Sequence, residues 1–255
     1  MFQSMLQSIL KNKKLVAIIL ACVLFLGILL GVILAINARK NEEPVAIGRF
    51  VLSAEASVIL SYDKNGAVLT IDGVNDHGVL LLDEYTDYYG KSCAAVIKEL
   101  LDKLTTAKHL TADSKYVILK HSFHSEVPNE EFLTSIRTET EAALAAISST
   151  AKLAFIEQTA LKDDGYMTLQ TAKSILLLHL GAEEFDYYVG PDALSGEEYL
   201  CTVTVNGVKA SYCINAFSGL IDTASEEQVE SYIHEFEEQE NEQIYEDLTG
   251  FEEDT

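Results

Sequence analysis

The sequence predicts an α+β protein with one transmembrane helix, a middle domain of order β-β-α-β-α-β, a small helix-plus-hairpin domain and an acidic tail. Three observations support this fold class. Residues 15–36 are apolar and uncharged, helical and strand-like periodicities alternate over residues 48–160, and an Asn-Gly pair separates two later strand-like runs. The expected divisions are a short N-terminus (1–14), the helix (15–36), a polar linker (37–47), the middle domain (48–160), the small domain (161–223) and the tail (224–255).

Residues 15–36 read LVAIILACVLFLGILLGVILAI and contain no charged or amide side chain. At about 1.5 Å per residue, a helix of this length spans roughly 33 Å, close to the hydrocarbon thickness of a bilayer. The alternative is a cleaved signal peptide. The run is longer than the apolar part of a typical signal peptide, and no clear small-residue cleavage site follows Ala35. We therefore expect an uncleaved, single-pass membrane anchor.

Flanking charges predict the orientation of this helix. Basic residues lie on both sides of it, with three before the span and two after it: Lys11, Lys13, Lys14, Arg39 and Lys40. The excess on the N-terminal side favours a cytoplasmic N-terminus and extracytoplasmic C-terminal domains.

Small residues recur every four positions within the same run, at Gly27, Gly31 and Ala35. Such a stripe lets a second helix approach closely. We therefore expect transmembrane packing there, either as a homodimer or with a membrane partner.

The chain of 255 residues has a formal net charge of −22. A strongly acidic surface repels phosphate, so nucleic acid is not an expected partner. No Lys or Arg follows Lys209, whereas residues 224–255 carry thirteen acidic residues. We expect this segment to be a solvated tail, helical around Val229, Ile233 and Phe236, with binding of cations or wall polymer as the alternative.

The middle domain is expected to begin with two strands joined by a turn and to end in a strand-helix-strand unit. Ser92 is the candidate N-cap of the first helix, and a turn followed by an apolar run precedes it. The expected elements are strands at 57–62, 67–73, 116–123 and 152–157, turns at 63–66 and 75–78, an apolar run at 79–82, and helices at 93–104 and 128–150.

In the small domain, Thr168 is expected to cap a helix that Gly181 ends. Asn206-Gly207 is a strong hairpin signal. With a two-residue turn, Cys201 faces Tyr212 and Cys213 faces Leu200, so the two thiols point to opposite faces and form no disulfide. A three-residue loop would reverse this expectation.

No motif indicates catalysis or a metal site. His121 and His124 lie three apart on a strand, so their side chains point to opposite faces, and we expect exposed strand-end histidines. Asp72, Asn75 and Asp76 lack the alternating oxygen pattern of a calcium loop. We expect no enzyme, no metal and no cofactor.

Three tyrosines, Tyr85, Tyr88 and Tyr89, allow two interpretations. They form an exposed contact patch, or they are half-buried beside the sheet. His179, in the last turn of the predicted helix, is placed to interact favourably with the negative end of the helix dipole.

Residues 56–85, ASVILSYDKNGAVLTIDGVNDHGVLLLDEY, and the elements after them resemble the extracytoplasmic middle domain of the RsgI-type anti-sigma factors of Firmicutes. The resemblance covers about residues 48–160. It rests on the strand pair around Asn65-Gly66, the Asn75-Asp76-His77-Gly78 segment, and Gly90-Lys91-Ser92 before a helix. Residues 164–222 resemble a PepSY-type domain over a shorter stretch, with Ile214-Asn215-Ala216-Phe217-Ser218-Gly219 where that family often has V-D-A-x-T-G.

Two departures from the RsgI-type pattern change what the resemblance implies. About fourteen residues precede the apolar run, too few for the folded sigma-binding domain of that family. Where the family commonly self-cleaves at an Asn-Pro bond, this chain has Glu55-Ala56, so we expect no self-cleavage there.

The resemblance implies a membrane-anchored sensing or regulatory module that acts by protein–protein contact. The alternatives are an exported peptidase inhibitor or partner, through the PepSY-like half, and a module that binds wall polymer or cations.

Overall fold

The computed structural model describes residues 24–25, 27–28, 44–147, 150–190 and 197–234. Contacts divide the chain into Met1–Pro44 and Val45–Thr255. In the first unit, Leu24, Phe25 and Ile28 are helical and expose their side chains. Gly27 is helical as well, and the other residues of the predicted transmembrane helix at 15–36 lie outside the described residues. Within the described part of the chain, no helix is long and apolar enough to cross a membrane.

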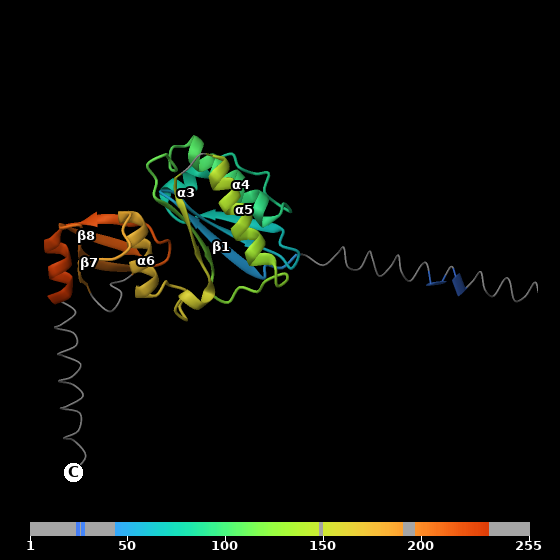
Figure 1. Ribbon diagram of the computed structural model, residues 1–255. Helices are drawn as coiled ribbons and strands as arrows, with labels where there is room; N and C mark the ends of the chain where they lie inside the picture. The colour runs from blue at the N-terminus through green and yellow to red at the C-terminus, as the bar shows by residue number, and fades with distance from the viewer. Residues whose placement is uncertain (1–23, 26, 29–43, 148–149, 191–196, 235–255) are drawn as a thin grey trace, which may run out of the picture. The chain divides into compact units, whose positions relative to one another are not determined.

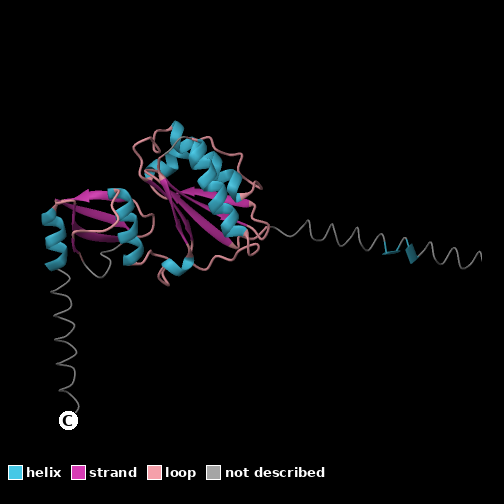
Figure 2. Ribbon diagram, viewed as in Figure 1, coloured by secondary structure: helices cyan, strands magenta, loops and turns pink. Residues whose placement is uncertain are grey.

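The second unit begins with a five-stranded mixed sheet of order β3-β2-β1-β4-β5 (Figures 1 and 2). Only the β4–β5 pair is parallel. The strands are β1 Gly48–Ser53, β2 Ser57–Tyr62, β3 Val68–Gly73, β4 Tyr116–His121 and β5 Lys152–Ile156. The expected β-β-α-β-α-β order was incomplete because it omitted β1, which is the central strand. Five of the six residues of β1 are buried, so it lacks the alternation that marks a half-exposed strand.

Two long helices, α4 Cys93–Thr106 and α5 Phe132–Ala146, pack on one face of this sheet (Figure 1). Ser92 caps α4 as expected, and its hydroxyl accepts a hydrogen bond from the Ala95 backbone N–H at 3.3 Å. The turn expected at 75–78 is instead the start of a short helix, α3 Asp76–Leu81. Asn75 ends the extended chain and caps α3, so the residues that suggested a turn are helix-start residues.

A four-stranded antiparallel sheet of order β6-β7-β8-β9 follows (Figure 2). Its strands are β6 Tyr187–Val189, β7 Glu198–Val205, β8 Val208–Asn215 and β9 Ile221–Ala224. The predicted hairpin register is confirmed, with Cys201 opposite Tyr212 and Cys213 opposite Leu200. Strands β6 and β9 were not predicted. The helix expected around Val229 and Ile233 is confirmed, because residues 226–234 are helical, but Val229 is buried, so this part of the expected tail is not a solvated segment.

Helix α6 Leu169–Leu180 contributes to two hydrophobic clusters. Thr168 caps it and Gly181 ends it in the left-handed conformation, both as expected. Ala172 and Leu176 pack with the four-stranded sheet. Ile175 packs with Ile118 of β4 and Ile156 of β5 on the five-stranded sheet. The small domain therefore shares a core with the middle domain.

Lys120 of β4 is the buried charged residue of this shared region, with 1 % of its surface exposed. Its Nζ donates to the Gly165 carbonyl oxygen at 3.3 Å and lies 3.8 Å from the centre of the Phe217 ring. Among the described residues, no carboxylate pairs with it. Burial lowers the pKa of Lys120 to about 8, so the ammonium is held at a cost near neutral pH.

We expect Lys120→Met to raise the free energy of unfolding at pH 7 by about 1 to 2 kcal/mol, because it removes the desolvation cost while the apolar stem still contacts Phe217. The desolvation cost is fully present below the native pKa of about 8 and disappears above 10.5, the pKa of Lys in the unfolded chain. The difference in free energy of unfolding between the variant and the native chain therefore shrinks as the pH rises toward 10.5. Thermal unfolding of both chains at pH 7 and in alkali measures it. The control variant is Lys98→Met, because Lys98 is exposed and carries no such desolvation cost. A Tm for Lys120→Met below that of the native chain at pH 7 would contradict the expectation.

Candidate functional site

The predicted site residues fall in two places. Gly27 is helical with open space around it, whereas Gly31 and Ala35 lie outside the described residues, so packing through this stripe stays a prediction.

Glu55 and Ala56 lie in the turn between β1 and β2. Ser53 pairs with Ser57 across this turn, and the Ala54 N–H donates to the Ala56 carbonyl oxygen at 3.0 Å. The Glu55 side chain is exposed and Ala56 is buried.

Asn75 fixes this turn against the start of α3. Its Oδ1 accepts from the backbone N–H of Ser57 at 3.0 Å and of Gly78 at 2.8 Å. Its Nδ2 donates to the Glu55 carbonyl oxygen at 3.0 Å. One side chain therefore caps a helix and holds both the middle of the turn, at Glu55, and the first residue of β2, Ser57. The sequence predicted a turn at Asn75; the signal for its real role was an N-capping residue type four positions before a short apolar run.

Gly78 allows the close approach of α3 to β2. A Cβ at this position would lie 1.9 Å from the Ser57 carbonyl oxygen. That oxygen also accepts from the Val74 N–H at 2.8 Å, so it belongs to a fixed piece of backbone. Only a residue without a side chain fits there.

Two histidines converge on Glu55 at the turn. His77 is in the first turn of α3, and His109 follows the end of α4. The Nδ1 atom of His109 lies 3.2 Å from Oε2 of Glu55, and the two imidazole rings have centres 4.8 Å apart. One ligand atom from each of the three residues lies within 4.8 Å of the other two. The sequence pattern did not reveal this group, because its members are separated by more than twenty residues.

The backbone around His109 holds the residue in place. The His109 N–H donates to the Leu104 carbonyl oxygen at 2.9 Å, and the Lys108 N–H donates to that of Thr105 at 3.1 Å. Lys108 itself is left-handed, with φ of 65°. These are the bonds of a Schellman motif with Lys108 in the place that glycine usually takes.

The three residues border a cleft of about 490 Å³. Residues from both domains line it, among them Asp113 and Lys115 before β4, His179 of α6 and Asp222 of β9. Both signs of charge are present, so the cleft favours no simple anion or cation by charge alone. Its distinguishing chemistry is the pair of imidazoles beside one carboxylate.

His121 is not the exposed histidine that we expected, because 1 % of its surface is accessible. Its Nε2 lies 2.7 Å from the Tyr62 hydroxyl, which donates to the Glu126 carbonyl oxygen at 2.7 Å. Its Nδ1 lies 3.3 Å from Nε2 of Gln158. A neutral ring protonated on Nε2 donates to the Tyr62 hydroxyl and accepts from Gln158 on Nδ1, so each of these hydrogen bonds has one donor and one acceptor. Burial lowers the pKa of His121 to about 4.

His124 is exposed as expected. His179 lies in the last turn of α6, between the rings of Tyr116 and Tyr212. Burial lowers the pKa of His179, which opposes the charged form that would interact best with the helix end.

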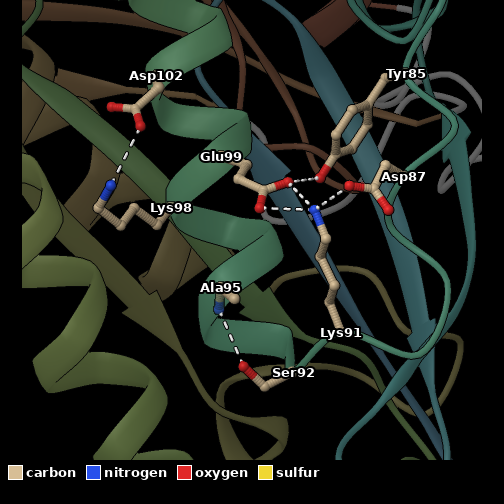
Figure 3. A network of polar contacts seen from close by, with 8 residues as sticks. All are labelled: Tyr85, Asp87, Lys91, Ser92, Ala95, Lys98, Glu99 and Asp102. Atoms are coloured by element: carbon tan, nitrogen blue, oxygen red, sulfur yellow. Dashed lines mark hydrogen bonds and ion pairs between the residues drawn. The ribbon is translucent and has the colours of Figure 1, made fainter.

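The tyrosine cluster divides between the two interpretations. Tyr85 and Tyr88 pack against the main core, whereas Tyr89 is 64 % exposed. Figure 3 shows Tyr85 and Lys91 converging on Glu99 of α4, with Tyr85 donating to Glu99 Oε2 at 2.7 Å and Lys91 Nζ 2.9 Å from Oε1. Hydrogen bonding by Tyr85, then by Lys91, lowers the pKa of Glu99. The network ties the loop before α4 to that helix, so Tyr85 and Tyr88 have a structural role.

One comparison identifies the middle of the chain. The family model of the anti-sigma factor RsgI-like central domain matches residues 53–172, from the end of β1 into α6. No match supports the PepSY-type resemblance of residues 164–222. No curated protein matches the chain significantly. The matched segment contains Glu55, Asn75, His77 and His109. Residues 53–172 are therefore similar to the anti-sigma factor RsgI-like central domain, and this match implies an anti-sigma-factor-related module in that part of the chain.

Proposed function

We propose that this protein is a membrane-anchored, extracytoplasmic sensing or regulatory module that acts through protein–protein contact. One observation carries the proposal: an RsgI-like central domain at residues 53–172 follows an uncharged apolar run at 15–36. RsgI-type central domains are extracytoplasmic in membrane anti-sigma factors. The order of the two segments here, with the basic residues mainly before the run, supports the same topology.

We propose that this role does not involve catalysis. The thiols of the described cysteines are poorly suited to act as nucleophiles, because burial raises the pKa of Cys93, Cys201 and Cys213 to about 12. Glu55 and Ala56 supply neither the amide nor the proline of the self-cleaving pair, and we therefore propose an intact chain.

Contact with a partner is proposed to use exposed apolar side chains, which lose water when covered. Leu80 on α3 is 70 % exposed, and Val208 at the start of β8 is 69 % exposed. These two positions report separately on the RsgI-like domain and on the small domain.

The test uses Leu80→Cys in the full chain, in a Cys213→Ser background, expressed in intact cells. We expect a membrane-impermeant maleimide to label Cys at position 80 without lysis, because the domain is proposed to face outward. The labelled chain should migrate as one band. Labelling only after lysis would contradict the topology, and a fragment that begins near Glu55 would contradict the intact chain.

The same cysteine, carrying a photoactivated cross-linker, tests protein contact, with Val208→Cys as the matched position. Cross-linking to a regulatory membrane protein from position 80 supports the proposal. Cross-linking to a peptidase from position 208 alone would favour the alternative, an exported peptidase partner that acts through the small domain. The basis of that alternative is the resemblance of residues 164–222 to a PepSY-type domain, where α6 packs on a four-stranded antiparallel sheet with an Asn-Gly hairpin.

A further inference from the structure

We infer that Glu55, His77 and His109 form a binding site for a first-row divalent metal ion of the zinc type. One ligand atom from each residue lies within 4.8 Å of the other two. Two imidazole nitrogens and one carboxylate oxygen are ligands that Zn²⁺ prefers, whereas Ca²⁺ and Mg²⁺ favour sites made of oxygen atoms. The inference is separate from the proposed function, because it concerns the isolated chain and needs neither a partner nor an orientation.

The backbone of each ligand is fixed independently of the side chain. The Glu55 carbonyl is held by Asn75, and the same Asn75 caps the helix that begins just before His77. His109 is held by the hydrogen bonds that close the end of α4. Three preset backbone positions lower the entropy cost of assembling a site.

The side chains retain the freedom needed to close around an ion. A tetrahedral ion with bonds of about 2.0 to 2.1 Å brings its ligand atoms to roughly 3.4 Å from one another. Oε2 of Glu55 and Nδ1 of His109 are already 3.2 Å apart, so His77 makes the main adjustment. The His77 side chain is exposed at the surface, where a change of rotamer meets little resistance.

The ion would join three elements: the β1–β2 turn, α3 and the end of α4. Three protein ligands leave a fourth position open for water or for a side chain of a partner. Because the metal holds the folded arrangement and not the unfolded chain, it is expected to raise thermal stability.

The experiment is isothermal titration of ZnCl2 into the full-length chain in detergent micelles, purified through a tag without histidine. We expect one high-affinity Zn²⁺ per chain and a Tm raised by roughly 5 °C or more at a hundredfold excess over Kd. His77→Gln and His109→Gln should each weaken binding by roughly tenfold or more, since even the loss of an outer hydrogen-bond partner costs that much. CoCl2 should give the visible absorption bands of a tetrahedral site in the native chain.

The control variant is His124→Gln, because His124 is an exposed histidine outside the cleft. Its Zn²⁺ affinity should equal that of the native chain. Circular dichroism of His77→Gln tests whether this variant is folded, which keeps the result interpretable if His109→Gln unfolds. Full affinity in His77→Gln, displacement of Zn²⁺ by excess CaCl2 as expected for binding to the acidic tail, or no Zn²⁺ binding by the native chain would each overturn the inference.

Discussion

Gly78→Ala is expected to destabilise the protein by about 3 kcal/mol or more. The new methyl group would lie 1.9 Å from the Ser57 carbonyl oxygen, well inside contact distance, and that oxygen is backbone. Helix α3 must therefore move away from β2. Overpacking of this kind costs about 1 to 3 kcal/mol, and occasionally more.

The movement also breaks hydrogen bonds, because Asn75 links α3 to Ser57 and to Glu55. Each buried N–H left without an acceptor costs about 1 to 3 kcal/mol. Alanine favours a helix over glycine by about 1 kcal/mol, which offsets only a part of the loss. The net effect corresponds to a fall in Tm of roughly 6 to 12 °C for a domain of this size.

Thermal unfolding of the full chain measures the effect, with Leu80→Ala as the control. Leu80 lies on the same helix and is 70 % exposed, so its truncation should change stability by less than about 0.5 kcal/mol. If Gly78→Ala unfolds at the same temperature as the control, the close approach of α3 to Ser57 is not a feature of the folded protein.

Acid is expected to destabilise the native chain through His121. Its pKa is lowered by burial from 6.5 to about 4, so the unfolded chain binds the proton more readily than the folded chain. The contribution of His121 to the free energy of unfolding is therefore constant above pH 6.5. It falls as the pH is lowered from 6.5 to about 4 and levels off below the native pKa. The full effect of this one group is about 3 kcal/mol.

The physical reason is specific to the hydrogen-bond network. A proton on Nδ1 of His121 would face the amide group of Gln158, which donates to the Ser125 carbonyl oxygen at 2.5 Å. Two donors would then point at each other. At the other nitrogen, the Tyr62 hydroxyl already donates to Glu126, so it accepts from the ring in both protonation states.

The pH dependence of Tm for the native chain and for His121→Gln measures this contribution. We expect the variant to have the shallower slope between pH 6.5 and 4. His179, whose pKa is also lowered by burial, acts in the same direction in both chains, and so do Asp63 and Glu99, whose pKa values are lowered. Parallel slopes for the two chains would show that His121 is not buried in the neutral form.

The sequence by itself determined the elements that local chemistry dictates. Ser92 and Thr168 start helices because their hydroxyls satisfy free N–H groups, and Gly181 ends one because it accepts a left-handed backbone. The Asn206-Gly207 turn fixed the register of the hairpin, and with it the opposite faces of Cys201 and Cys213.

The tertiary structure decided what depends on neighbours distant in sequence. Strand β1 has no alternation because it is the central strand, and Asn75-Asp76-His77-Gly78 starts a helix because Asn75 finds acceptors and donors in the β1–β2 turn. His121 and Lys120 are buried because other segments cover both faces of β4. The convergence of Glu55, His77 and His109 arises only when the turn, α3 and the end of α4 meet, since no local spacing can record a contact between separate elements.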